Sequence, residues 1–110
     1  MKEFYHTTDR HGVSEINPDH KRMRELLDEL VEAGDSDSPH PDVSLVHDGS
    51  GWALTVYSRG VVTFENLDRS DDRPRYLSDV PRREVLAMWI ELSEGRIEQV
   101  NSRPWLRDEA

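Results

Sequence analysis

Histidine and aspartate side chains gather at two places in this sequence, and these residue types are common ligands of metal ions. One group lies near the start of the chain and the other in its middle: His6, Asp9 and His11, and then His40, Asp42, His47 and Asp48. Neither group has the i,i+4 helical spacing or the paired short motifs that are typical of zinc sites. We therefore expect no metal ion and no other cofactor.

Nucleophilic or acid–base catalysis has equally little support. Ser50 lies between Gly49 and Gly51, but a nucleophile elbow needs the pattern G-x-S-x-G at a strand-to-helix turn, and this segment is predicted to join two strands. Two pairs of neighbouring acids remain, Asp35 with Asp37 and Asp71 with Asp72. They fall in predicted exposed loops, where nothing prepares a carboxylate for acid–base chemistry. We predict no catalytic residue, and a small hydrolase that uses His and Asp stays open as an alternative.

The composition narrows the kinds of partner. The chain has 110 residues with 14 Lys and Arg against 23 Asp and Glu, a formal net charge of −9, so we expect it not to bind nucleic acid. It contains no cysteine, which excludes disulfides and thiolate ligands. Its first residues do not have the pattern of a signal peptide, and no apolar run is long enough to span a membrane, so we expect a cytoplasmic protein without a membrane partner. The acid excess fits either simple solubility or attraction to a basic protein.

Three consecutive segments rich in β-formers carry the strongest long-range inference. They are 43–47, 52–57 and 61–66, and short glycine-containing loops join them. These loop lengths set one register, in which Leu45 pairs with Leu54 and Leu54 pairs with Phe64. The register places six apolar side chains on one face of the sheet: Val43, Leu45, Leu54, Val56, Val62 and Phe64.

Two helices flank these strands. The first is predicted to begin with Asn17 as its N-cap and Pro18 at its first position, and apolar residues recur at helical spacing from Met23 to Val31. The second starts near 78–81 and ends at Gly95, with Val85, Met88, Trp89 and Leu92 on its buried side. Residues 96–100 are predicted as a short strand.

The predicted fold is therefore a two-layer α+β domain with the order α-β-β-β-α. A three-stranded antiparallel meander is covered on one face by the two helices, and short terminal strands are an open option. Residues 1–110 are expected to form a single domain, with 1–16 and 107–110 poorly ordered. Lys2–Thr8 is read as either an extra edge strand or a disordered lead.

The second face of the sheet is mixed in character, and it is the candidate surface for a protein partner. Aromatic residues at the ends of elements are either anchors or lids. The candidate contact residues are Val46, Trp52, Tyr57, Val61 and Trp105. The competing interpretation is that the N-terminal segment covers this face.

The order of elements also carries a resemblance to a known family. The strands of 43–66, the segment Val80–Ile97 with its helical Trp89, and the closing pair Pro104 and Trp105 resemble small acidic immunity proteins of bacterial toxin systems. The resemblance covers about the last two thirds of the chain. It implies a protein that binds and blocks a cognate toxin, often a basic nuclease, through acidic and aromatic surface residues.

Three hypotheses about function follow. The first is a non-catalytic protein-binding module that acts as an inhibitor of a basic partner. The second is a structural or regulatory domain that forms a homodimer through the exposed sheet face. The third is the small hydrolase named above, which would need a deep pocket beside His40 or His47.

Overall fold

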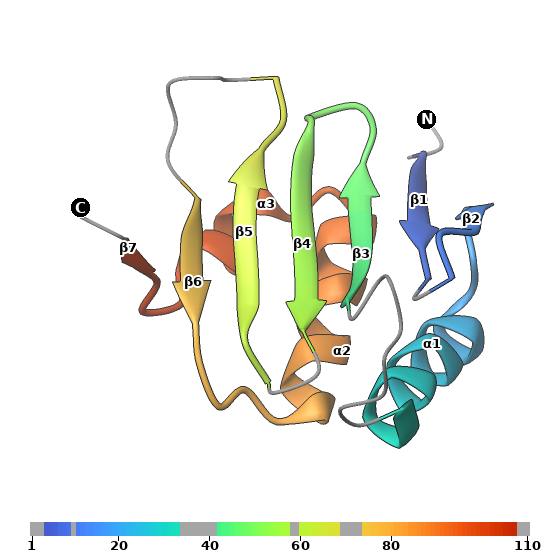
Figure 1. The fold of residues 1–110 in the computed structure, drawn as a ribbon. Helices are drawn as coiled ribbons and strands as arrows, with labels where there is room; N and C mark the ends of the chain where they lie inside the picture. Colours follow the sequence, from blue (N-terminus) through green and yellow to red (C-terminus); the bar gives the residue numbers. More distant parts are fainter. Residues whose placement is uncertain (1–3, 10, 34–41, 58–59, 69–73, 108–110) are drawn as a thin grey trace.

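A computed structural model describes residues 4–9, 11–33, 42–57, 60–68 and 74–107 of the chain. Its elements in chain order are β1 (Tyr5–Thr8), β2 (Ser14–Ile16), α1 (His20–Ala33), β3 (Asp42–His47), β4 (Trp52–Tyr57), β5 (Val62–Asn66), β6 (Arg75–Leu77), α2 (Arg82–Ser93), α3 (Ile97–Asn101) and β7 (Leu106–Arg107). Figure 1 shows α2 and α3 behind the sheet and α1 below β1 and β2.

The predicted three-stranded meander under two helices is wrong, although the fold is α+β. Within the described residues the sheet has seven strands in the order β2-β1-β3-β4-β5-β6-β7, with every neighbouring pair antiparallel, and there are three helices. The four additional strands are two to four residues long. Strands this short carry too few residues for a visible apolar alternation, and they form because the central strands offer them backbone partners. β1 is not an edge strand, since it pairs with both β2 and β3.

The central register predicted from the loops is confirmed. Leu45 pairs with Leu54 across β3 and β4, and Leu54 pairs with Phe64 across β4 and β5. The six apolar residues predicted to share a face all belong to the buried core. The helices add the rest of this core from one side: Met23, Leu26, Leu27 and Leu30 from α1, Val85, Met88, Trp89 and Leu92 from α2, and Val100 from α3.

The start of α1 differs from the prediction. Asp19 is the capping residue, because its Oδ1 accepts a hydrogen bond from the Arg22 backbone N–H at 2.8 Å. Asn17 instead adopts the left-handed conformation, with φ of 50°, and its Oδ1 accepts a hydrogen bond from the Tyr5 N–H at 2.9 Å. Asn17 therefore joins β1 to the approach of α1.

The segment after α2 is helical, so the strand predicted for residues 96–100 is wrong. α3 follows α2 directly, and its Val100 is fully buried while Glu98 and Gln99 are exposed. Burying one apolar residue against α2 needs only a single helical turn, whereas a strand would need a partner in the sheet.

Candidate functional site: the open face of the sheet

Strand alternation divides the sheet into two faces, because successive side chains on a strand point to opposite sides. One face packs on the helices and contains Leu54 and Phe64. The other, which we call the open face, looks toward the viewer in Figure 1, and no described helix covers it. The register arranges its positions in three rows that run across the strands. The first row contains Ile16, His6, Val46, Ala53 and Glu65. The second contains Ser14, Thr8, Ser44, Thr55, Thr63, Tyr76 and Leu106, and the third contains Asp42, Tyr57 and Val61.

Exposed apolar side chains gather on this face. Ile16 is 77% exposed and Leu106 is 51% exposed, and the ring of Tyr57 also reaches solvent. Phe4, one residue before β1, continues the same alternation and is 58% exposed. Most large apolar side chains that the described residues leave in water thus share one side of the sheet, which is a feature of interaction surfaces.

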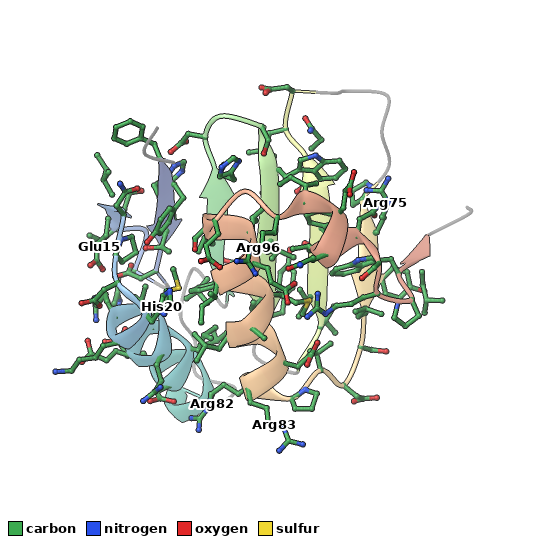
Figure 2. All side chains as sticks on the ribbon, turned by 180° about the vertical axis from the view of Figure 1, so that it is seen from behind. Glu15, His20, Arg75, Arg82, Arg83 and Arg96 are labelled. Carbon is green, nitrogen blue, oxygen red and sulfur yellow. The ribbon has the colours of Figure 1, made fainter. Side chains whose placement is uncertain are left out.

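The charges on the open face are acidic. Asp42 and Glu65 occupy open-face positions, and Asp48 lies in the turn after β3. Among the open-face strand positions given above there is no Lys or Arg. Arg75, Arg82, Arg83 and Arg96 belong to the opposite side, which Figure 2 views from behind. The open-face strand positions therefore carry acids without bases, whereas the helical side carries both arginines and acids.

The pKa of Tyr57 depends on its burial and on the nearby acids. Burial raises the pKa of its phenol, and the carboxylates of Asp42 and Glu65 raise it further, while a hydrogen bond with Thr63 works in the opposite direction. The phenol and both carboxylates therefore share one patch of surface. A cation brought to this patch would be attracted by both acids and by the face of the ring.

His6 and Asp48 form a polar contact at one corner of the open face. His6 Nδ1 lies 2.8 Å from Asp48 Oδ1, and both side chains are partly exposed. This contact connects β1 to the turn between β3 and β4. It holds the imidazole in a fixed place beside Ile16 and Val46, its neighbours in the same row.

A row of hydroxyl groups crosses the middle of the open face. It consists of Ser14, Thr8, Ser44, Thr55, Thr63 and Tyr76 on six neighbouring strands. At one end of the row Thr8 and Ser14 bond to each other, with their hydroxyl oxygens 3.1 Å apart. Hydroxyl groups both donate and accept, so this row offers a partner hydrogen bonds without adding charge.

The structure brings together only some of the contact residues predicted from the sequence. Val46, Tyr57 and Val61 lie on the open face. Trp52 and Trp105 lie on the helical side, where both stack on Phe64 with ring centroids 4.4 and 5.3 Å away. Trp105 also donates a hydrogen bond from Nε1 to the Val100 carbonyl, so these two tryptophans serve the packing of the domain.

Sequence reasoning missed Phe4, Ile16 and the contact of His6 with Asp48. The N-terminal apolar residues carried no recognisable period, since β1 and β2 together span only seven residues. Trp52 did carry a usable signal, because it has the same parity along β4 as Leu54 and must share its face.

The histidine and serine of the first hairpin stabilise the turn. His47 is buried, and its Nδ1 lies 2.7 Å from Ser50 Oγ, which also accepts a hydrogen bond from the Trp52 N–H. In the part of the chain that the structure describes, no three His, Asp or Glu side chains are placed to hold a metal ion. The remaining candidates from the sequence, His40 and the acid pairs at 35, 37, 71 and 72, lie outside the described residues.

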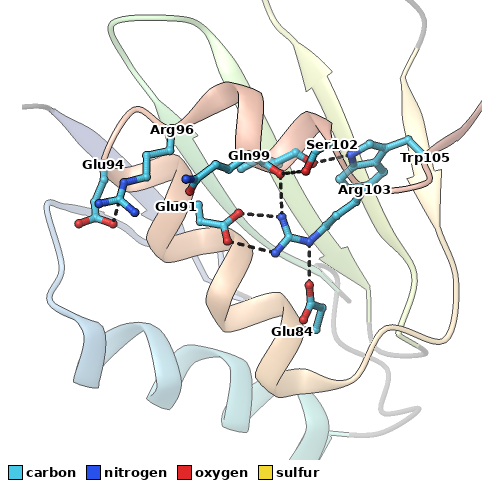
Figure 3. Close-up of polar contacts among 9 residues, drawn as sticks. Glu84, Glu91, Glu94, Arg96, Gln99, Ser102, Arg103 and Trp105 are labelled. Atoms are coloured by element: carbon cyan, nitrogen blue, oxygen red, sulfur yellow. Dashed lines mark hydrogen bonds and ion pairs between the residues drawn. The ribbon is translucent and has the colours of Figure 1, made fainter.

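An ion network on the helical side fixes the C-terminal segment (Figure 3). Arg103 Nη1 and Nη2 donate to the Glu91 carboxylate at 2.7 and 3.1 Å, and Arg103 Nε donates to Glu84 at 2.7 Å. These hydrogen bonds raise the pKa of Arg103, with the largest contribution from Glu91. All three guanidinium nitrogens of Arg103 donate hydrogen bonds within the protein, so the role of the network is structural rather than ligand-binding.

Comparison with protein-family models, with curated proteins and with solved structures gave no match to this chain. Of the described helices, none combines the length and the apolar character that crossing a membrane requires.

Proposed function

We propose that this protein is a non-catalytic binding module that docks a basic protein on the open face of its sheet and thereby inhibits it. The observation that supports this most is the composition of that face. Exposed Ile16 and Tyr57 share it with Asp42 and Glu65, and its described strand positions carry no Lys or Arg.

Physical chemistry gives each part of this surface a role in docking. Opposite charge steers a basic partner toward the acids and raises the rate of encounter. Apolar and aromatic side chains supply most of the free energy of binding once water is excluded. The hydroxyl row satisfies polar groups of the partner that would otherwise be buried without hydrogen bonds.

An inhibitory role of the immunity kind is part of the same proposal. It rests on the resemblance in element order and on the acidic, partly aromatic character of the surface. Inhibition would follow if the docked chain covers the working surface of the partner, so no chemistry by this protein is needed.

The test first captures a partner protein from cell extract and then measures its affinity with purified proteins. The chain and the double variant Asp42→Lys/Glu65→Lys are immobilised side by side, and extract of the native cells is passed over both. A protein retained by the first only is identified, purified and titrated against both by calorimetry. We expect a basic partner whose affinity falls at least tenfold in the variant and falls as salt is raised.

The matched control is Glu94→Lys/Glu98→Lys, which changes the same number of charges at exposed positions on the helical side. This variant should bind nearly as well as the original chain. The proposal is contradicted if the control weakens binding as much as the open-face variant, if the partner is acidic, or if no protein is retained selectively.

A further inference from the structure

At the corner of the open face occupied by His6, apolar side chains lie on both sides of the imidazole. Three residues make up this apolar corner: Phe4, Ile16 and Val46. Ile16 on β2 and Val46 on β3 flank His6 on β1 in a single row, and Phe4 lies two residues before His6 on the same side. Ile16, at 77% exposure, is the most exposed large apolar side chain in the described part of the chain.

Such an arrangement is unfavourable for the isolated chain. Removing apolar surface from water is favourable, and the core already buries the apolar residues on the other face of β3, β4 and β5. Scattered exposed apolar residues are normal, but Phe4 lies diagonally from both Ile16 and Val46 on the strands beside β1, so the three form one patch around His6. The patch is rigid, because the contact between His6 and Asp48 and the pairing of β1 with β3 hold its strands in place.

We infer that the apolar corner enters an apolar recess on the basic partner, and that the rim of this recess carries Lys or Arg side chains. The inference rests on the proposed function and names the part of the partner that makes contact. Phe4 and Ile16 fill the recess, while Asp48, in the turn beside Phe4, and Glu65, farther along the row of Val46, meet the cationic rim.

The acids near the apolar corner favour a basic partner over a second copy of the same chain. Two copies that met face to face through the corner would bring Asp48 and Glu65 of each chain toward the same acids of the other. Like charges at an interface oppose association, whereas a cationic rim neutralises them. The corner therefore fits a basic partner better than it fits itself.

The experiment compares three single variants with the purified partner by calorimetry. Ile16→Ser and Phe4→Ser remove apolar anchors at exposed positions, so the fold should survive, and circular dichroism checks this. Val13→Ser is the control, since Val13 is 55% exposed but lies in the turn between β1 and β2. We expect at least a tenfold loss of affinity for each anchor variant and less than a twofold change for the control.

The outcomes separate this inference from the proposed function. If the anchor variants bind as well as the control while Asp42→Lys/Glu65→Lys still weakens binding, the corner is not the contact and the inference fails alone. If the charge variant also has no effect, both proposals fail. Light scattering on the chain by itself should report a monomer, and a dimer that Ile16→Ser dissociates would overturn the inference by assigning the corner to a second copy.

Discussion

Arg103 donates hydrogen bonds to the carboxylate of Glu91 from both of its terminal nitrogens, with N–O distances of 2.7 and 3.1 Å. Its side chain is only 17% exposed. The pair fastens the segment after α3 to α2, and two residues later Trp105 stacks on Phe64. One partly buried ion pair thus closes the end of the core.

Replacing Arg103 with Ala should lower the free energy of unfolding by about 1 to 3 kcal/mol, because Glu91 would lose the hydrogen bonds of a charged partner in a partly buried place. Arg96→Ala is the matched control: Arg96 lies 3.8 Å from Glu94, with 56% of its side chain exposed. That change should cost less than about 0.5 kcal/mol. Urea unfolding measures both, and equal losses would show that the Arg103 network does not hold the segment.

Tyr5 should make stability depend on alkaline pH. Burial raises the pKa of its phenol, and Asp19 raises it further, so the folded chain keeps this proton to a higher pH than the unfolded chain does. The unfolded chain then ionises first, above a pH of about 10, and the free energy of unfolding falls as pH rises further.

Tyr5→Phe isolates this contribution. At pH 8 the variant should be less stable by about 1 kcal/mol, because the hydroxyl donates a hydrogen bond to the Pro18 carbonyl. As pH rises from about 9 to 11 the gap should narrow, since only the original chain loses stability through this group. Unfolding curves across that range provide the measurement, and a gap that stays constant would contradict the burial of the Tyr5 hydroxyl.

The turn between β3 and β4 supplies a backbone test of the hairpin. Gly51 has φ of 78°, and a Cβ there would collide with the side chain of Asp68. Gly51→Ala should therefore cost about 1 to 2 kcal/mol of stability. A Cβ on Gly49 would meet only the His47 ring, at 3.7 Å, so Gly49→Ala should change stability by less than about 0.5 kcal/mol. Thermal unfolding of Gly51→Ala and Gly49→Ala tests this difference. Similar losses of stability in the two variants would mean that the turn has a different shape.

The sequence was informative where loops were short and apolar residues alternated. The glycine-containing turns set the pairing of Leu54 with Leu45 and with Phe64, and both pairs are present. Helical spacing likewise identified the buried side of α2, including Trp89. In these elements a shift of one residue would expose the whole apolar set, so the register is strongly determined.

The rest of the sheet depends on contacts that no local pattern reveals. β6 has three residues and adds to the free edge of β5, and β7, with two residues, then pairs with β6. Asn17 and Asp19 are both good capping residues, and only the pairing of Asn17 with Tyr5 decides between them. The apolar corner was invisible for the same reason, since Phe4 and Ile16 become neighbours only when β1 and β2 pair.

The most direct test of the central claim is a cross-saturation experiment on the complex of the methyl-labelled chain with its unlabelled partner. Saturating the partner should reduce the methyl signals of Ile16, Val46 and Val61, whose side chains line the open face. The signals of Leu27 and Val85, which are buried between the helices and the sheet, should keep their intensity. Loss of signal from the methyl groups of α1 or α2, with Val46 and Val61 unaffected, would place the partner on the helical side and contradict the account.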